Sequence, residues 1–284
     1  MQSSPLSSVE SARKSVANRL RDLRLDAGLT MQGLADACRW SNKSKVSRIE
    51  SVKQTPTDSD IRAWCAACEV PEQAPDLIAA TRDAGTMYVE WRRLERTGLR
   101  RLQESGVPLY ERTRRFRTYA TRLIPGTLQT ENYARALLST IAAFRGIPDD
   151  SAEAARARVE RAQVVYKAGR HFAFVIEEDV LYFRHGSRAD MAAQLQALLD
   201  VMPRQNVSLG VIPRGAERAD VWGQETFTMF DDDRVHVELL TAKVTVTQPS
   251  EINLYARAFE RLSDMAAYGA EARAMINAAI SSLG

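Results

Sequence analysis

The sequence predicts an α+β protein with three consecutive parts. The first is an all-α domain over residues 1–75, where apolar residues at helical spacing alternate with turn residues. The second is a helical linker over 76–122 that is rich in arginine. The third is a mixed α/β domain over 123–284, where short apolar and aromatic runs from about residue 171 predict a small sheet.

The composition is typical of a globular protein. The chain has 284 residues, of which 45% are hydrophobic and 26% are charged. No apolar run approaches the ~18–20 residues that span a bilayer, so we expect no membrane contact. The first residues, MQSSPLSSVESARKSV, lack the apolar segment of a signal peptide. With only three cysteines, a disulfide framework is not expected, and we expect a cytoplasmic protein.

Charge is distributed unevenly along the chain, although the net charge is only +3. Residues 92–122 carry 10 Arg and 3 Glu, whereas residues 123–284 carry 17 Lys or Arg and 21 Asp or Glu. A basic front and an acidic back suit a protein that binds a polyanion at its front. The alternative for 92–122 is that arginine-rich helices have solvated faces.

Four short helices are predicted in the N-terminal domain. Gly28 suits the C-terminus of the first helix, and Thr30 suits the N-terminus of the second. Ser41 or Asn42 is expected to cap the third. The helices are expected at about 16–27, 31–38, 45–52 and 59–68.

This order of helices is the helix-turn-helix plan, in which the third helix enters the major groove of DNA. Val46 and Ile49 lie three residues apart and are expected to face the domain core, which sets the rotation of the helix. The positions around them carry donors that suit base edges and phosphates. The residues expected at the DNA are Asn42, Lys43, Lys45, Ser47 and Arg48.

Two strings in this domain, GLTMQGLA at 28–35 and SKVSRIE at 44–50, resemble the Xre/Cro family of helix-turn-helix regulators over residues 15–71. The resemblance implies that the third helix reads DNA and that Gln32 also lies near it. Three features depart from the family pattern. Met31 replaces a glutamine, the turn at 40–44 is one residue longer, and Val52 replaces the glycine that ends the third helix.

The C-terminal domain alternates predicted strands and helices. Strands are expected at 171–176, 207–212, 225–230, 235–240 and 243–246. The acidic turn at 231–233 is expected to join the third and fourth of these as a hairpin. Helices are expected at about 191–202, 250–266 and 270–282.

Several fragments of this domain occur in the order found in one group of regulators. They are IPGTLQTENYARAL at 124–137, an R-x-x-R pattern at 158–161, and short matches at 176–181, 191–195, 211–213, 223–227 and 237–238. Residues 88–282 therefore resemble the C-terminal domain of actinobacterial Scr1-like, or antitoxin-like, transcriptional regulators. The resemblance implies a sensor or interaction domain behind a DNA-binding domain, with a small partner protein often encoded nearby.

Five residues are candidates for a ligand site in the C-terminal domain: Tyr133, Glu178, Arg184, Trp222 and Glu238. Tyr133 follows a bend at 125–126, which is either a structural turn or part of a pocket lining. Glu178 lies in an acidic run that suits a bound cation or amine, or a solvated loop. Glu238 needs an arginine such as Arg184 if it points inward, and is ordinary sheet surface if it points outward. Trp222 either lines an apolar cavity or lies exposed in a loop.

No cofactor and no metal site is expected. Cys65 and Cys68 have the spacing of a redox or metal motif, but zinc needs about four ligands, and the histidines lie far along the chain. We therefore expect both cysteines in the domain core. The sequence has no glycine-rich phosphate loop and no nucleophile elbow, so no residue is assigned a catalytic role.

These observations favour a cytoplasmic DNA-binding transcriptional regulator. A homodimer on a double-stranded operator is expected, because one small domain reads few base pairs. The C-terminal domain would respond to a small molecule or a small partner protein. The alternative is an enzyme of a secondary-metabolite pathway, or a pure interaction protein, with a helix-turn-helix that no longer binds DNA. The departures at Met31 and Val52 motivate that alternative.

Overall fold

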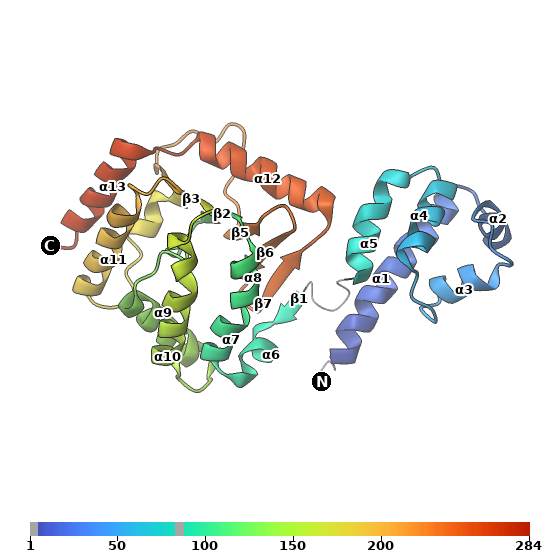
Figure 1. Cartoon of the computed structure of the whole chain (residues 1–284), viewed down its shortest axis with the longest axis horizontal. Helices are drawn as coiled ribbons and strands as arrows, with labels where there is room; N and C mark the ends of the chain where they lie inside the picture. Colours follow the sequence, from blue (N-terminus) through green and yellow to red (C-terminus); the bar gives the residue numbers. More distant parts are fainter. Residues whose placement is uncertain (1–4, 83–87) are drawn as a thin grey trace. The chain divides into compact units, whose positions relative to one another are not determined.

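The computed structural model describes residues 5–82 and 88–284. The chain divides into two compact units (Figure 1). The first comprises the residues up to Val89 together with Thr245–Asn253, and the second comprises Glu90–Val244 and Leu254–Gly284. The predicted α+β class is confirmed, with helices in the first unit and a mixed sheet with helices in the second. In the part of the chain that is described, no helix combines the length and the apolar character needed to cross a bilayer.

The first unit is built from short helices packed around one apolar core. Its helices are α1 (Pro5–Asp26), α2 (Met31–Ala37), α3 (Ser44–Glu50), α4 (Asp58–Ala67), the 3-10 turn η1 (Pro71–Gln73) and α5 (Ala74–Arg82). Leu20 of α1, Val46 of α3 and Trp64 of α4 meet in the core. The Trp64 indole N–H donates to the Leu20 carbonyl over 2.9 Å, so the one polar atom of this buried ring is satisfied.

Four helices of this unit end in the same way. The second residue after each helix adopts a positive φ, namely 67° at Gly28, 56° at Arg39, 62° at Val52 and 62° at Glu69. The next residue donates its N–H to the carbonyl five positions back, as Lys53 does to Arg48 over 2.8 Å. This is the Schellman motif, which satisfies carbonyls that the helix leaves free. Only the first of the four ends uses glycine, and Val52 is β-branched, which makes its conformation the least favourable of them.

The second unit contains most of a seven-stranded sheet of order β1-β7-β6-β5-β2-β3-β4. The strands are β1 (Tyr88–Glu90), β2 (Arg115–Ala120), β3 (His171–Glu177), β4 (Val207–Ile212), β5 (Phe227–Phe230), β6 (Arg234–Glu238) and β7 (Ala242–Val246). The helices are α6 (Trp91–Leu94), α7 (Leu99–Ser105), α8 (Val107–Arg112), α9 (Glu131–Arg145), α10 (Ser151–Ala162), α11 (Arg188–Val201), α12 (Pro249–Asp264) and α13 (Gly269–Ser281). Short 3-10 turns are η2 (Glu95–Thr97), η3 (Gln163–Tyr166) and η4 (Glu178–Leu181).

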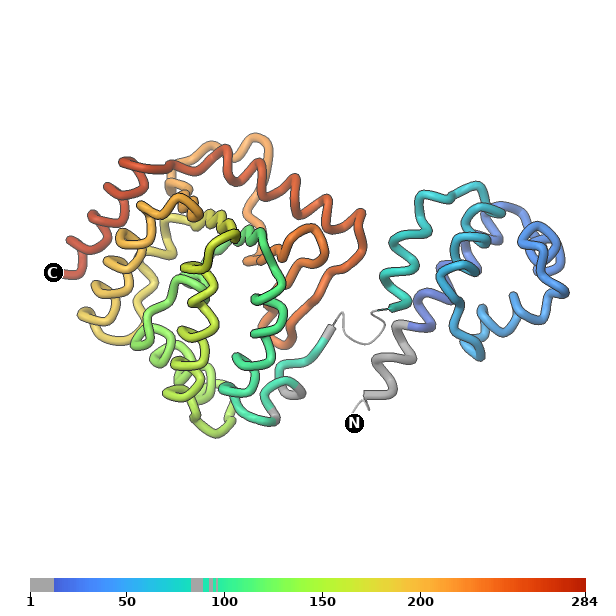
Figure 2. Tube along the Cα trace, in the orientation of Figure 1, coloured from blue at the N-terminus to red at the C-terminus, as the bar shows by residue number. Residues whose placement is uncertain are grey.

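The sheet combines a parallel half with an antiparallel half. β2, β3 and β4 run parallel, whereas β5 pairs antiparallel with both β2 and β6. One face of the sheet contributes Phe116, Phe172 and Phe230 to a core with residues of α9, α11 and α13. Figure 2 shows α11 and α13 side by side, although they are far apart in the sequence. On the opposite face, the Phe227 ring lies 6.5 Å from the Phe259 ring of α12.

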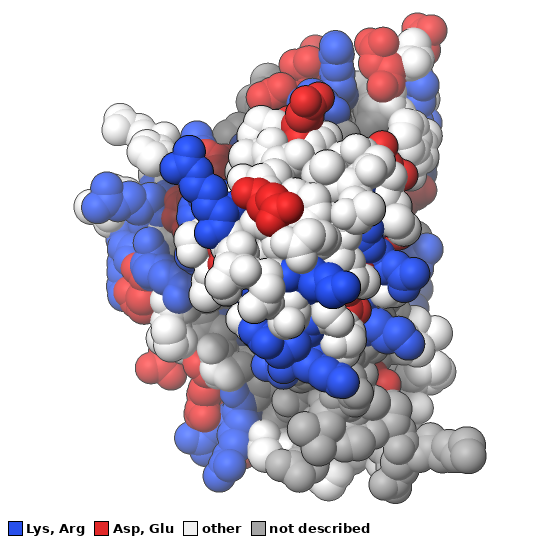
Figure 3. Space-filling view, turned by 90° about the vertical axis from the view of Figure 1, so that its right-hand side faces the viewer, with Lys and Arg blue, Asp and Glu red and all other residues white. Residues whose placement is uncertain are grey.

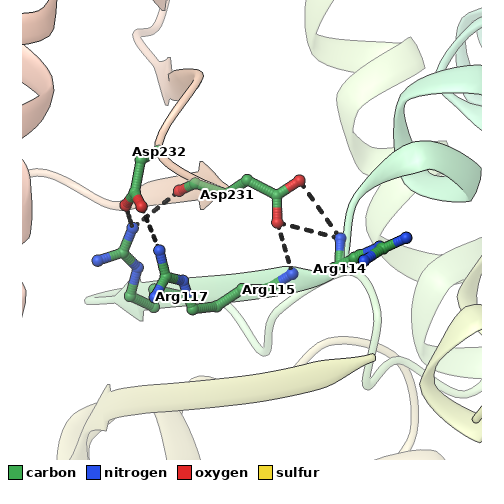
Figure 4. Close-up of polar contacts among 5 residues, drawn as sticks. All are labelled: Arg114, Arg115, Arg117, Asp231 and Asp232. Atoms are coloured by element: carbon green, nitrogen blue, oxygen red, sulfur yellow. Dashed lines mark hydrogen bonds and ion pairs between the residues drawn. The ribbon is translucent and has the colours of Figure 1, made fainter. Parts of the chain in front are cut away.

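The strands and helices expected from residue 171 onward are confirmed, but the region 76–122 is not helical throughout. Residues 115–120 form β2, which lies between β5 and β3 in the sheet. Arginine alternates with buried residues here, and Asp232 of the β5–β6 turn pairs with both Arg115 and Arg117 (Figure 4). Asp231 of the same turn accepts the backbone N–H of Arg115 over 2.8 Å. Arg115 and Arg117 thus belong to a strand whose charges an acidic turn compensates.

We expect Val52→Gly to stabilise the first unit. The substitution removes the conformational cost of a β-branched residue at positive φ, about 1–2 kcal/mol. The unfolded chain has more conformational entropy with glycine at this position, which offsets about 0.5–1 kcal/mol of that gain in stability. Thermal unfolding of the full chain measures the difference. Val52→Ala keeps a Cβ at the same φ and is the control, and an equal or lower melting temperature for Val52→Gly than for Val52→Ala would contradict the assignment.

Candidate nucleic-acid interface

The orientation of α3 is set by a buried ion pair. The Arg24 guanidinium of α1 donates from Nε to Glu50 Oε1 over 2.6 Å and from Nη2 to Oε2 over 3.1 Å. Its Nη1 also donates to the Leu29 carbonyl in the turn before α2, over 2.7 Å. Both charged side chains are almost fully buried. A buried pair with this two-pronged geometry is costly to break from one side, by about 3–5 kcal/mol, so it holds α1, the turn and α3 in one arrangement.

The rotation of α3 follows from its apolar residues, as the sequence predicts. Val46 and Ile49 are fully buried, which turns Ser47 and Arg48 outward. In the turn before the helix, Asn42 is exposed, and its Oδ1 accepts the N–H of Ser44 over 2.9 Å. Lys43 is the N-cap residue of α3, and Asn42, one residue before it, satisfies the first N–H of the helix. Asn42 thus stands at the same end as the exposed first residues of α3.

The predicted DNA-facing residues differ in what they contact. Lys43 and Ser47 are exposed, and neither side chain has a hydrogen bond or ion pair within the described residues. Arg48 is exposed, and its Nε donates to Gln54 Oε1 over 3.0 Å. Gln32 is exposed on α2 and donates to Asp36 over 2.8 Å. These side chains are accessible to a ligand that approaches α3 or α2.

Lys45 has a different environment. Its Nζ lies 2.5 Å from Asp60 Oδ1 and 4.4 Å from the centre of the Trp40 ring. Asp60 also forms a capping box with Thr57 at the start of α4. Lys45 thus connects α3 to α4 and to the turn before α3. The ammonium group of Lys45 therefore has partners within the protein, whereas the sequence alone suggested contact with DNA.

Lys and Arg side chains lie across the face that presents this unit. Figure 3 shows clusters of them over the middle of the view, with uncharged surface between the clusters. Arg39, Lys43, Arg48 and Lys53 are exposed in and around α3. Within 39–53, Glu50 is the only acidic residue, and the buried pair with Arg24 uses its charge. The surface around α3 is therefore positively charged, which suits the phosphate backbone of a nucleic acid.

The five ligand-site candidates of the C-terminal domain do not form one site. Tyr133 is fully buried, its ring lies 5.4 Å from that of His185, and its hydroxyl accepts the N–H of Ile124. Arg184 is exposed and has no ion pair within the described residues. Trp222 is 75% exposed, which matches the loop alternative. Glu238 is exposed at the end of β6, which matches the surface alternative.

The acidic run around Glu178 is used within the protein. Glu177 pairs with Arg218 over 2.6 Å, and Asp179 pairs with Arg214 over 2.5 Å. Glu178 accepts the backbone N–H of Arg214 over 2.9 Å. All three carboxylates therefore hold the segment that follows β4. Among the described residues, no group of His, Cys, Asp and Glu side chains could hold a metal ion.

The cysteines lie in the core of the first unit. Cys65 and Cys68 are buried, and Cys38 is partly buried. Burial and the neighbouring Cys68 raise the pKa of the Cys65 thiol to about 11. The reactive thiolate form is thus disfavoured at neutral pH.

Sequence reasoning missed two residues that shape this interface. Arg24 reads as one more charge on a helix, and its partner Glu50 lies 26 residues away. Asp60 reads as a residue of the first turn of α4, where acidic residues are common. A buried position on the apolar stripe of α1 is the one signal that could have singled out Arg24, because an arginine there needs a partner.

The helices, the buried ion pair and the exposed face of α3 define a helix-turn-helix protein, the class of DNA-binding regulators. A family model described as a helix-turn-helix domain matches residues 15–77. A second, described as a domain of unknown function (DUF5753), matches residues 107–278. The second match covers more than half of the chain, so the protein belongs to the DUF5753 family. No curated protein matches the chain.

Replacing Lys45 by methionine should destabilise the protein in a pH-dependent way. Burial alone would raise the pKa of Asp60, but hydrogen bonds from Lys45 and Thr57 outweigh it and hold the pKa below its usual value. A carboxyl group with a lowered pKa stabilises the fold above its unfolded pKa, about 3.9, and loses that contribution as the pH falls. We therefore expect Lys45→Met to lower the free energy of unfolding by about 1–3 kcal/mol at pH 7 and by less near pH 3.

Urea unfolding of the full chain at the two pH values measures this. Lys43→Met removes a charge without a partner and is the control, with unfolding close to that of the parent at both pH values. A deficit in Lys45→Met that stays constant with pH would contradict the role of Asp60.

Proposed function

We propose that this protein is a transcriptional regulator of the Xre type that binds a double-stranded DNA operator through α3. The observation that carries the proposal is the Arg24–Glu50 ion pair together with the exposed side of α3. The pair fixes a short helix with its apolar side inward. It leaves Ser47 and Arg48 outward, next to Asn42 and Lys43 in the preceding turn.

The exposed residues divide by chemistry into two roles. Lys43 is a flexible point charge that suits a phosphate, which contributes affinity and little sequence preference. Both Arg48 and Asn42 carry planar groups that match base edges in the major groove, with paired donors on the Arg48 guanidinium and a donor beside an acceptor on the Asn42 amide. Ser47 and Gln32 add shorter-range hydrogen bonds. Lys45 positions α3 through Asp60 and Trp40 and does not face the duplex in this proposal.

The C-terminal domain is proposed to receive the signal. Its supporting feature is a separate compact unit with its own sheet and core, attached to a DNA-binding domain. A small molecule or a small partner protein would bind there, in line with the sensor or interaction role that the resemblance to Scr1-like regulators implies. We further propose that the protein acts in the cytoplasm as a homodimer, because a single helix-turn-helix contacts too few base pairs for a specific operator.

The proposal is tested with a duplex that the purified full chain selects from a random pool. Fluorescence anisotropy then compares the parent with Arg48→Ala, Lys43→Ala and the control Arg156→Ala, which removes an exposed charge from α10 of the second unit. Arg48→Ala should weaken binding about tenfold or more and relax the preference at one base position. Lys43→Ala should weaken binding to all duplexes alike and lower the salt dependence by about one ion.

Arg156→Ala should bind like the parent. Equal losses in all three variants would mean that net charge and not α3 determines binding. No loss in Arg48→Ala and Lys43→Ala would contradict the placement of DNA at α3.

A further inference from the structure

One face of the sheet carries a row of polar and cationic side chains beside its aromatic core. In β6, Val235 and Val237 are buried on the opposite face, so Arg234 and His236 lie on the face of Phe230. The rings of His236 and Phe230 are 4.7 Å apart. Arg234 pairs directly with Phe230 in the register of the two strands. On this face of the sheet, the polar side chains of β6 thus lie next to the aromatic Phe230 of β5.

The neighbouring strand adds a lysine to the same face. The N–H of Leu239 donates to the Ala242 carbonyl over 2.8 Å, which closes the hairpin between β6 and β7. Residue 239 therefore opposes 242, and Lys243 opposes Glu238. Glu238 shares its face with Arg234 and His236, because side chains two residues apart on a strand point the same way. Lys243 accordingly lies on that face as well.

Helix α10 brings two more cations over this face. Arg158 and Arg161 lie three residues apart and share one side of the helix. The Arg161 guanidinium stacks 4.5 Å from the centre of the Tyr110 ring of α8. The Tyr110 ring lies 5.5 Å from the Phe230 ring, on which His236 packs. We call Arg158, Arg161, Arg234 and Lys243 the cationic cluster.

The hydrogen bonds that hold the two arginines of α10 come from neutral acceptors. Arg158 donates from Nε to Gln103 Oε1 over 3.1 Å and from Nη1 to Gln129 Oε1 over 2.6 Å. Arg161 donates from Nη1 to the Gln103 carbonyl over 3.0 Å. Gln103 and Gln129 are themselves buried. Amide oxygens satisfy N–H groups but leave the positive charge uncompensated, unlike a carboxylate.

Two donors of the cluster have no partner although they are buried. The Nε atoms of Arg161 and Arg234 are buried from solvent and make no hydrogen bond. Within the described part of the chain, no member of the cluster forms an ion pair. Buried polar groups without partners are rare in folded proteins and call for an explanation. Four cations near a single exposed carboxylate, Glu238, form a region of strong positive potential.

The ionisation behaviour of the neighbouring groups reflects this potential. Burial, together with Lys243, Arg234 and Arg161, lowers the pKa of His236 to about 3, so its imidazole is neutral. Burial lowers the pKa of Lys243, which the charge of Glu238 partly opposes. Burial and Arg161 lower the pKa of Arg158 to about 10. The charged forms of Lys243 and Arg158 are thus destabilised by burial and by their positive neighbours, and a bound anion would relieve that repulsion.

We propose that the cationic cluster binds a compact oxyanion with at least two negative charges, either a phosphate ester or a polycarboxylate. Guanidinium groups match both oxyanions with two parallel hydrogen bonds. The neutral imidazole of His236 offers one further N–H donor. The partly exposed ring of Tyr110, which packs on the buried Phe230 ring, provides an apolar surface for the organic part of such a ligand.

The proposal also gives a role to two sequence motifs. Gln129 belongs to the IPGTLQT string at 124–130, and Arg158 and Arg161 form the R-x-x-R pattern. The hydrogen bond from Arg158 to Gln129 joins the two motifs. In this account both motifs serve to hold uncompensated arginines in place.

The inference names a ligand class for the C-terminal domain and rests on the proposed function only in treating that domain as the one that receives a signal. Binding is therefore measured without DNA, so that failure at the cluster is distinct from failure at α3. Isothermal titration of the full chain uses inorganic phosphate and citrate as probes. Sodium chloride at matched ionic strength is the reference.

The titration is repeated with Arg161→Gln, Arg234→Gln and the control Arg156→Gln, an exposed arginine on the same helix. We expect phosphate, citrate or both to bind at one site per chain. Losing a charge-assisted hydrogen bond should weaken binding about tenfold or more in the first two variants and leave the control unchanged. Binding of phosphate alone would indicate a phosphate ester, and binding of citrate alone a polycarboxylate.

A second measurement on the unmodified chain guards against variants that fail to fold. A bound anion should raise the pKa of His236, observed by NMR, because its charge offsets Lys243, Arg234 and Arg161. The exposed His171 serves as the internal control. Neither probe binding above the chloride reference, equal binding in all variants, or an unchanged His236 pKa at saturation would overturn the proposal. Binding of a poly-glutamate peptide without either small anion would also overturn it, in favour of an acidic protein partner.

Discussion

The buried ion pair between Arg24 and Glu50 is the interaction on which the DNA-binding unit depends. It joins α1 to α3 with two hydrogen bonds, and the third donor of Arg24 closes the turn that leads into α2. Because both charges are buried, neither can be lost without leaving the other uncompensated. The pair therefore specifies one rotation and one position for α3. The exposed face of that helix, and with it the proposed contact with DNA, follows from this constraint together with the burial of Val46 and Ile49.

In the C-terminal domain, carboxylates compensate some arginine charges and leave others uncompensated. Where arginine lies at the start of β2, the acidic turn between β5 and β6 compensates it through Asp232. Where arginine lies on α10, only amide and carbonyl oxygens approach it, and its charge stays available. The same domain thus contains compensated arginines that tie strands together and uncompensated arginines beside aromatic rings. This contrast distinguishes a structural role from a binding role without reference to any ligand.

Sequence periodicity was sufficient for the elements whose burial pattern is local. It predicted the short helices of the first unit, the inward position of Val46 and Ile49, and the strands from residue 171 onward. It failed for β2, because arginine at alternate positions resembles a solvated helix until the partner Asp232 is known. It placed Lys45 among the donors expected at DNA and gave no sign of its pairing with Asp60, because that pairing is a tertiary contact. The cationic cluster escaped notice for the same reason, as its members come from α10, β6 and β7.

The central claim is that α3 reads the sequence of a DNA duplex. The most direct test is fluorescence anisotropy of the full chain on the DNA upstream of its own gene and on a scrambled duplex of equal length, at two salt concentrations. The account predicts tighter binding to the upstream duplex at both concentrations, and weaker binding to both duplexes at the higher one, because phosphate contacts release counterions. Equal affinity for the two duplexes, or no binding to either, would contradict it.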